Sequence, residues 1–316
     1  MRGVLLDLDT LGDDLDLGRL EASLDDWNLH PVTAADEVAA RIAGAEVAVS
    51  NKVLLDAAAL AASPQLRLIA IAATGTNNVD LEAARAAGIV VSNVTGYGTP
   101  SVAQHVFSLL LALTTRLVDY RAAVRDGRWA ASPHFCLLDY PIRELQGKVL
   151  GIVGFGELGQ GVARLAEAFG MEVRVAQRPG GPAQAGRVPL AELLPAVDVL
   201  TLHCPLTAAT HHLIGAAELA AMRDDAVLIN TARGGIVDEA ALAAALRTGT
   251  LGGAGFDVLT VEPPRAGNPL LAPDLPNLIV TPHVAWAARE SRQRLIDQVA
   301  ENIRRFRAGD PRNRVV

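Results

Sequence analysis

The amino-acid sequence predicts an α/β protein with two doubly wound parallel-sheet domains. Three observations support this fold class. Short apolar runs alternate with alanine-rich helical stretches, the alternation occurs in two series, and the second series opens with a glycine-rich turn between a strand and a helix. Because parallel neighbours need a crossover connection, usually a helix, two such series predict two sheets.

The first series predicts short buried strands separated by helices. A longer helical pattern follows it at residues 100–125, with Ser101 as a candidate N-cap. A helix of this length exceeds what one small domain needs, so we expect it to connect two lobes or to extend to a partner chain. The expected strands of this series cover residues 4–8, 47–50, 68–72 and 90–92, and its helices cover residues 36–43, 54–62 and 81–88.

The second series contains enough elements for a complete dinucleotide-binding domain. We expect the last helix, residues 290–308, to pack back on the first lobe. The predicted division is a discontinuous substrate domain, residues 1–98 and 289–316, and a dinucleotide-binding domain, residues 99–288. The expected strands of the second series cover residues 149–154, 172–176, 199–203, 227–230, 253–257 and 278–281, and its helices cover residues 159–169, 216–222 and 239–247.

The composition of the chain argues against several classes of protein. The formal net charge is −7, and the one basic cluster, Arg304, Arg305 and Arg307, is typical of a solvated helix end, so no nucleic-acid partner is expected. The first residues lack the pattern of a signal peptide, and the apolar run at residues 106–113 is too short to span a bilayer. Two cysteines cannot build a disulfide framework, which favours a cytoplasmic protein.

No metal site is predicted. Cys136 and Cys204 fit no metal-ligand spacing, and His203, His211 and His212 are not at helical i, i+4 spacing and lack a carboxylate cluster. Cys204, at a predicted strand end, could be a reactive thiol or a small packing residue, and the second role is the more common one.

The glycine-rich turn matches a dinucleotide-binding fingerprint. Gly154-Phe155-Gly156-Glu157-Leu158-Gly159 follows an apolar strand and opens a helix, which is the context that this motif requires. Gly154 permits the tight turn, Gly156 lets the backbone approach a pyrophosphate, and Gly159 lets helix and strand pack closely. Amides at the helix N-terminus would then face the phosphates. The alternative is a glycine-rich turn without a ligand.

The end of the next strand bears on the choice of cofactor. NAD-binding domains usually carry an acidic residue there for the ribose hydroxyls, but this chain has Gln177 followed by Arg178. Because an arginine can pair with a 2′-phosphate, the pattern favours NADPH. The alternative is an exposed Arg178 in a domain that binds NADH in the ordinary way.

Polar motifs follow three later strands of the second series: Asn230-Thr231-Ala232-Arg233-Gly234-Gly235, Leu259-Thr260-Val261-Glu262-Pro263-Pro264 and Thr281-Pro282-His283-Val284-Ala285-Trp286. In an open α/β sheet, ligands bind at the carboxyl ends of the strands. An arginine, a glutamate and a histidine at that edge, after a nucleotide fingerprint, predict a catalytic site.

These residue types suit hydride transfer to a 2-keto acid. Arg233 can hold the substrate carboxylate and polarise the carbonyl group with its planar fork. His283 can give a proton to the carbonyl oxygen near neutral pH. Glu262, paired with His283, would stabilise the imidazolium and fix the tautomer of the ring.

With these motifs the chain resembles the D-isomer-specific 2-hydroxyacid dehydrogenases over essentially its whole length. Within that family it is similar to bacterial glycerate dehydrogenases, also called hydroxypyruvate reductases, at residues 73–80, 101–105 and 282–286. The resemblance implies a Rossmann-type cofactor domain and a flavodoxin-like substrate domain, with Arg233, Glu262 and His283 as catalytic residues.

The resemblance also implies the remaining site residues and a homodimer. Amides around Thr74 and Gly75 would hold the substrate carboxylate. Apart from the resemblance, Trp286, three residues past His283, is a candidate wall of the substrate pocket or a core residue. Asp257 would face the nicotinamide carboxamide. Further cofactor contacts would come from Glu157, Leu158, Cys204, Pro205, Thr231 and Ala232. The departure from the common NAD pattern at Gln177 and Arg178 leaves the choice between NAD and NADP open.

Three functions remain as hypotheses. The first is reduction of hydroxypyruvate or glyoxylate, or the reverse oxidation of D-glycerate or glycolate. The second is oxidation of another small oxyanion, such as phosphite, on the same scaffold. The third is an NAD-sensing binding protein without turnover, against which the lack of long disordered extensions and of a basic surface argues.

Overall fold

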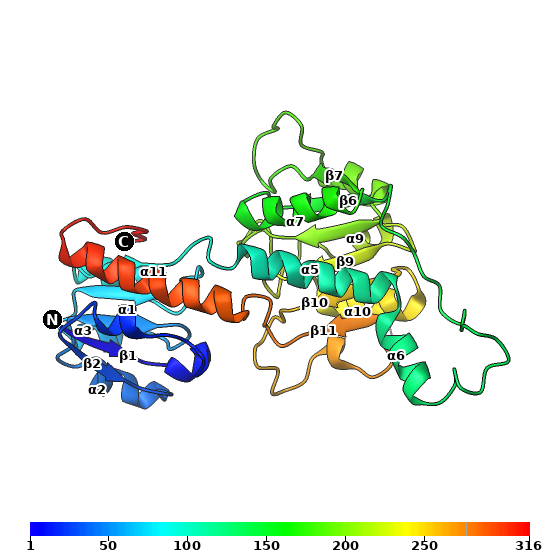
Figure 1. Cartoon of the computed structure of the whole chain (residues 1–316). Helices are drawn as coiled ribbons and strands as arrows, with labels where there is room; N and C mark the ends of the chain where they lie inside the picture. The colour runs from blue at the N-terminus through cyan, green and yellow to red at the C-terminus, as the bar shows by residue number, and fades with distance from the viewer. Residues whose placement is uncertain (276) are drawn as a thin grey trace. The chain divides into compact units, whose positions relative to one another are not determined.

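The computed structural model describes residues 1–275 and 277–316, and these form two compact units. Unit 1 comprises Met1–Gly98 and Ala287–Val316, and unit 2 comprises Thr99–Trp286 (Figure 1). The sequence prediction had the same first boundary and a second boundary two residues later, after residue 288.

Unit 1 contains a five-stranded parallel sheet in the order β2-β1-β3-β4-β5, which is the flavodoxin-like order 2-1-3-4-5. Strand β2 was not predicted, because it alternates between exposed and half-buried residues and carries polar Asp26 and Asn28. The first strand begins two residues and ends three residues earlier than the predicted 4–8, and a 3₁₀ turn, η1, begins at Leu8. The strands are β1 (Arg2–Leu5), β2 (Asp26–Leu29), β3 (Val47–Ser50), β4 (Leu68–Ile71) and β5 (Val90–Ser92).

The helices of unit 1 begin at polar caps where the sequence supplies them. The side chains of Asp56 and Asp80 accept hydrogen bonds from the backbone amides three residues on, at the starts of α3 and α4. The last helix, α11, packs against α1 and β4, so the prediction that it returns to the first lobe is confirmed (Figure 1). The helices are η1 (Leu8–Leu11), α1 (Gly18–Glu21), η2 (Ala35–Glu37), α2 (Val38–Ile42), α3 (Ala57–Ala61), α4 (Leu81–Ala86) and α11 (Arg289–Arg307).

Unit 2 contains a six-stranded parallel sheet in the order β11-β10-β9-β8-β6-β7. Val188 adds a single parallel bridge to Ala176, just beyond β7, so a vestigial third strand completes the Rossmann order at this edge. The order reverses between β6 and β8, which makes their carboxyl ends the expected ligand crevice. The strands are β6 (Val149–Val153), β7 (Glu172–Val175), β8 (Val199–Leu202), β9 (Val227–Asn230), β10 (Gly253–Phe256) and β11 (Leu278–Val280).

Both faces of this sheet are buried, which explains its nearly continuous apolar strands. In β9, Val227 and Ile229 pack on one side with α5 and α7, whereas Leu228 packs on the other with α9 and α10. The helices of unit 2 are α5 (Thr99–Thr114), α6 (Leu117–Arg125), α7 (Glu157–Ala168), α8 (Leu190–Leu193), η3 (Leu194–Ala196), α9 (Ala216–Ala221), α10 (Glu239–Thr248) and η4 (Pro269–Leu271).

The prediction of one helix over residues 100–125 was wrong. Helices α5 and α6 meet at an angle of 60°, because Arg116 between them adopts the left-handed conformation with φ of 55°. Ser101 is not the N-cap: it lies inside α5, and its hydroxyl donates to the carbonyl of Ala285 at 2.6 Å. Among the described residues no single helix has the length and apolar character needed to cross a membrane, and α5 with α6 meets that test only as a bent pair.

Candidate active site

The polar residues predicted for the site in unit 2 gather at the carboxyl edge of its sheet. The glycine-rich turn follows β6, His203 and Cys204 follow β8, and Arg233 lies beyond β9. Asp257 directly follows β10, and His283 lies beyond β11. Parallel pairing brings these ends to one side of the sheet, so motifs far apart in the sequence share an edge.

The glycine-rich turn requires two of its glycines for packing within the protein. Gly154 has φ of 94°, and a Cβ there would lie 2.6 Å from backbone atoms of His203 and Cys204. A Cβ on Gly159 would lie 2.3 Å from the carbonyl oxygen of Gly154. These two glycines therefore hold β6, α7 and the end of β8 close together.

Gly156 differs, because no described residue occupies the space beside it. A Cβ on this residue would meet no described atom within 4 Å. Gly156 is the N-cap of α7 and provides no side-chain cap, so Glu157 and Leu158 begin the helix with amides directed outward. A glycine that the fold does not need, at a helix N-terminus, fits close approach of a dinucleotide pyrophosphate.

The edge beside β7 carries two cations. The guanidinium of Arg178 is exposed and forms no ion pair or hydrogen bond within residues 1–275 and 277–316. Gln177, just before it, donates its side-chain amide to the carbonyl of Gly181. Arg187 lies over the ring of Phe155, 4.9 Å from its centroid, which ties this second cation to the glycine-rich turn. The acidic residue typical of NAD sites is absent from the strand end, as the sequence shows.

Two buried polar atoms at the middle of the edge lack partners in the described chain: the hydroxyl of Thr231 and Nδ1 of His203. Burial lowers the pKa of His203 to about 4, so the ring is neutral at neutral pH. An unpaired buried hydroxyl beside the glycine-rich edge fits a site completed by a ligand. These observations, with the space at Gly156, show that the residues present suit a dinucleotide.

Cys204 does not have the character of a reactive thiol. It is buried, and burial raises the pKa of its thiol to about 11, so the thiolate is scarce at neutral pH. Its backbone lies against Gly154, which supports the packing interpretation of the two considered from the sequence. Pro205, next to it, accepts a hydrogen bond from the hydroxyl of Thr210.

His283 and Glu262 form a direct pair. Nδ1 of His283 lies 2.6 Å from Oε2 of Glu262, while Oε1 of Glu262 accepts the amide of Leu259 at 2.7 Å. The side chains are 28% and 35% exposed, so solvent and substrate can reach them. Because Nδ1 faces the carboxylate, Nε2 is the ring nitrogen left for a substrate, and it has no partner in the part of the chain that is described.

Arg233 lies on a loop that packs against the loop of Glu262. A Cβ on Gly234 would lie 2.0 Å from the carbonyl carbon of Leu259, so only glycine lets these loops touch. Asn230 shapes the turn by accepting the amide of Ala232 and donating to the carbonyl of Arg233. The structure pairs no carboxylate with Arg233 among the residues it describes. Its guanidinium is therefore available to an anionic ligand.

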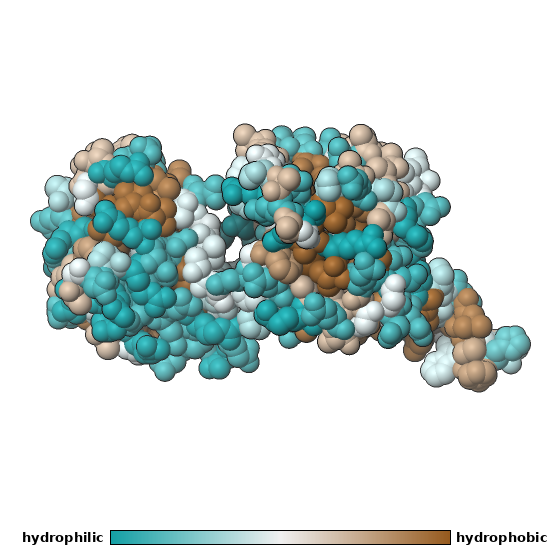
Figure 2. Space-filling model, turned by 90° about the horizontal axis from the view of Figure 1, so that it is seen from above, coloured by the Kyte–Doolittle hydropathy of each residue, from teal (hydrophilic) through white to brown (hydrophobic). Residues whose placement is uncertain are grey.

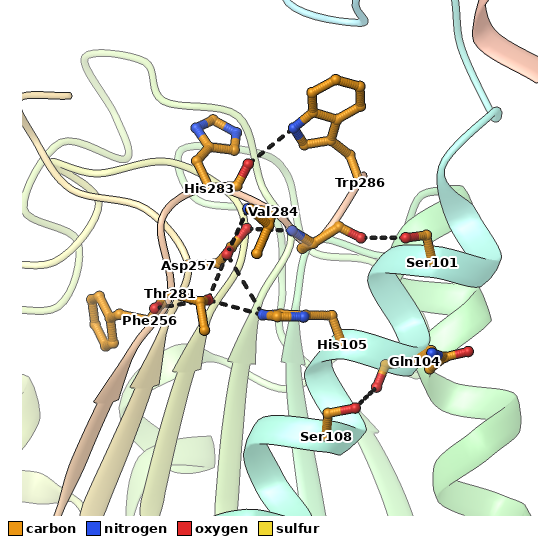
Figure 3. Close-up of polar contacts among 11 residues, drawn as sticks. Ser101, Gln104, His105, Ser108, Phe256, Asp257, Thr281, His283, Val284 and Trp286 are labelled. Carbon is orange, nitrogen blue, oxygen red and sulfur yellow. Dashed lines mark hydrogen bonds and ion pairs between the residues drawn. The ribbon is translucent and has the colours of Figure 1, made fainter. Parts of the chain in front are cut away.

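Asp257, which is predicted to face the nicotinamide carboxamide, is bonded within the protein. Its side chain is fully buried, and its carboxylate accepts hydrogen bonds from Thr281 Oγ1 at 2.6 Å, the Val284 amide at 2.9 Å and the Ala285 amide at 2.8 Å (Figure 3). In the structure Asp257 therefore organises the loop that carries His283, and a contact with the cofactor stays a prediction.

Trp286 is half-buried and belongs to none of the hydrophobic clusters of the described residues, and its indole Nε1 donates to the carbonyl of His283 at 2.9 Å (Figure 3). Thr74 and Gly75 belong to unit 1, shortly after β4. There the Thr74 hydroxyl donates to the carbonyl of Val94, and its own carbonyl accepts from Asn93. Their predicted role toward a substrate carboxylate stays a prediction.

Two residues that were not predicted for the site hold the loops of Glu262 and His283. Glu239, the first residue of α10, accepts the amide of Thr260 and the side-chain amide of Asn268, both at 2.7 Å, and so supports the loop of Glu262. His105 of α5 lies 2.9 Å from Thr281 Oγ1. No local pattern marks Glu239, because it acts on a segment distant in the sequence. His105 belongs to the segment 101–105 that supports the family resemblance, but its contact with Thr281 has no local signal. No group of three or more His, Cys, Asp or Glu suited to a metal ion occurs in the described chain.

Comparisons with known proteins agree with this geometry. Residues 107–285 match the family model described as D-isomer specific 2-hydroxyacid dehydrogenase, NAD binding domain. The chain is 48% identical to a glycerate dehydrogenase of Methylorubrum extorquens, over 95% of this chain and 96% of that one. It is 37% identical to a hydroxypyruvate reductase of Blautia hydrogenotrophica, over 89% and 88% of the two chains.

A solved structure of an NADPH-dependent glyoxylate/hydroxypyruvate reductase from Sinorhizobium meliloti, in complex with NADP and malonate, superposes with a TM-score of 0.82. It is 31% identical and covers 100% of this chain and 96% of its own. The nucleotide fingerprint, the His283–Glu262 pair and these matches together show that the chain belongs to the D-isomer-specific 2-hydroxyacid dehydrogenases, oxidoreductases with a nicotinamide cofactor.

Proposed function

We propose that this enzyme reduces hydroxypyruvate or glyoxylate with NAD(P)H, or oxidises D-glycerate or glycolate in reverse, with His283 as the acid/base. The observation that carries the proposal is the 2.6 Å pair between His283 and Glu262, which leaves one ring nitrogen open beside a sheet edge suited to a dinucleotide. The names of the relatives, a glycerate dehydrogenase and a hydroxypyruvate reductase, support the substrate class.

Each catalytic residue has a distinct task in this proposal. When bound, the nicotinamide ring supplies the hydride for reduction and accepts it in the reverse direction. Arg233 binds the carboxylate of the keto acid and polarises its carbonyl group. His283 gives the proton on Nε2 to the carbonyl oxygen as that oxygen becomes a hydroxyl, and Glu262 stabilises the imidazolium through Nδ1. Thr74 and Gly75 are proposed to bind the same carboxylate through their amides.

We propose NADPH as the preferred cofactor. Arg178 is an exposed cation with no partner in the described residues, at the strand end where a 2′-phosphate would lie. Arg187 adds a second positive charge beside the glycine-rich turn. The Sinorhizobium meliloti relative, whose structure contains NADP, supports this preference. The cofactor contacts predicted at Gln177, Glu157, Leu158, Cys204, Pro205, Thr231, Ala232 and Asp257 belong to the same proposal.

We propose a homodimer formed through the segment that follows α6. Four large apolar side chains there are exposed: Phe135 at 92%, Leu138 at 84%, Ile142 at 59% and Trp129 at 51%. Figure 2 shows hydrophobic atoms on the projection at the right-hand edge of the view, where Figure 1 draws this segment. An exposed apolar patch of this kind is typical of a protein interface. Sedimentation velocity tests the proposal, and a monomer at micromolar concentration would contradict it.

The cytoplasmic location expected from the cysteine content stays a prediction, which fractionation of cells that produce the protein would test.

A panel of 2-keto acids, each with NADH and with NADPH, tests the function. We expect rapid loss of reduced-cofactor absorbance with hydroxypyruvate and glyoxylate, and slower turnover with bulkier keto acids. Oxidation of phosphite with reduction of the cofactor, and no keto-acid turnover, would support the second hypothesis instead. Cofactor binding without any turnover would indicate a sensor.

A further inference from the structure

We propose that His105 is a positioning residue that holds His283 in its active conformation through Thr281 and Asp257. His105 lies on the face of α5 turned toward the end of β11 (Figure 3), and its side chain is 20% exposed. Its Nε2 is 2.9 Å from Oγ1 of Thr281 and 3.5 Å from Oδ1 of Asp257. The inference rests on the proposed role of His283 as acid/base.

The direction of these hydrogen bonds follows from the chemistry of the groups. Oγ1 of Thr281 lies 2.6 Å from Oδ1 of Asp257, and an ionised carboxylate only accepts, so the single hydroxyl proton of Thr281 points to Asp257. Oγ1 must then accept from His105, so Nε2 of His105 carries a proton. A side chain without a donor at this position would leave the Thr281 oxygen with nothing to accept.

Asp257 connects these hydrogen bonds to the loop that carries His283. Its carboxylate is fully buried and uses both oxygens: Oδ1 accepts the amide of Val284, and Oδ2 accepts the amide of Ala285. A buried carboxylate is costly unless donors surround it, so the Thr281 hydroxyl and the two amides are held firmly to it. The two residues immediately after His283 are thereby fixed in place.

His283 needs this support because its backbone is strained. It has φ of 55°, the left-handed region that a residue with a side chain rarely occupies. Its amide donates to the carbonyl of Thr281, and its carbonyl accepts from Trp286 (Figure 3). If the hydrogen bonds that link His105 to Thr281 and Asp257 are lost, the backbone of His283 can relax to a negative φ. The imidazole would then move away from Glu262.

Kinetics of His105→Leu, with His105→Gln as the conservative variant, test the inference. We expect His105→Leu to lower kcat for hydroxypyruvate roughly tenfold, while KM and the NADPH dissociation constant from fluorescence titration change less than about twofold. His105→Gln should recover most of the rate, because its amide can donate from nearly the same position. The matched control is Ser108→Ala on the same helix. Among the described residues its hydroxyl bonds only to the carbonyl of Gln104, so the variant should behave as the wild type.

A double variant tests whether His105 acts through Thr281. Thr281→Val should lower kcat to a similar degree, Thr281→Ser should restore it, and adding His105→Leu to Thr281→Val should cause little further loss. Additive losses, an unchanged kcat in His105→Leu, or an equal weakening of NADPH binding would each overturn the inference. Absence of keto-acid turnover by the wild type would instead refute the proposed function, so the two failures can be told apart.

Discussion

The two halves of the carboxyl edge in unit 2 are built in opposite ways. Beyond β9, β10 and β11, the loops of Arg233, Glu262 and His283 are fastened by Asn230, Glu239 and Asp257 through several short hydrogen bonds. Beside β6 and β7, Gly156 borders open space and the Arg178 guanidinium has no partner among the described residues.

The difference separates the tasks of the two halves. Proton transfer needs donors and acceptors within about 0.5 Å of the productive geometry, which rigid support provides. A dinucleotide brings its own phosphates and ribose, so the protein needs only space, outward amides and unpaired positive charge. Substitutions on the fastened half should therefore affect the rate, and those on the open half should affect cofactor binding.

His283→Gln should have the largest effect, because it removes the proposed acid/base from the half of the edge beyond β9, β10 and β11. The glutamine cannot act as an acid/base near neutral pH, so we expect kcat/KM for hydroxypyruvate to fall about 10²–10⁴-fold. Binding of NADPH, measured by fluorescence titration, should change little, because His283 belongs to the other half of the edge. A rate and pH-rate profile equal to those of the wild type would contradict the acid/base assignment.

The next effect concerns His203, at the end of β8 between the two halves. Burial lowers its pKa in the folded protein to about 4, against an ordinary value of 6.5. The unfolded chain therefore binds more protons between these values, and the free energy of unfolding should decrease as the pH falls from 6.5 toward 4. At pH 5 the loss attributable to this group is on the order of 2 kcal/mol.

Urea unfolding of the wild type and His203→Gln at pH 8 and pH 5 measures this contribution. The wild type should lose about 2 kcal/mol more than the variant over that interval, since glutamine does not titrate. Equal losses in the two proteins would show that His203 does not remain neutral in the folded state.

The smallest effect is expected at Arg178, in the half of the edge beside β6 and β7, and it concerns cofactor binding. Arg178→Ala should weaken NADPH binding roughly tenfold and NADH binding less than about twofold, because only NADPH carries the 2′-phosphate. Arg174→Ala is a matched control on β7, since Arg174 already pairs with Glu172. Equal loss with both cofactors would refute the role of Arg178 and leave NADH as the better assignment.

Much of the fold was predictable because its signals are local. The strands β3, β5 and β9 have the predicted bounds, and most others differ by a residue at one end. The edge strand β2 was not predicted, because a half-exposed polar strand lacks the continuous apolar run that marks a central one. The break between α5 and α6 was also not predicted, because no glycine or proline marks the left-handed position of Arg116.

The sequence by itself determined the α/β architecture and the dinucleotide fingerprint, and it supplied Arg233, Glu262 and His283 as the proposed catalytic residues. Each of these depends on neighbouring residues: an apolar period, glycines at a strand-to-helix turn, or polar residues just past a strand. Only the tertiary structure decided that Asp257 turns into the loop of His283 and that His105 meets Thr281 across 176 positions of sequence. Those contacts depend on how α5 packs across β10 and β11, and no local pattern encodes the register of that packing.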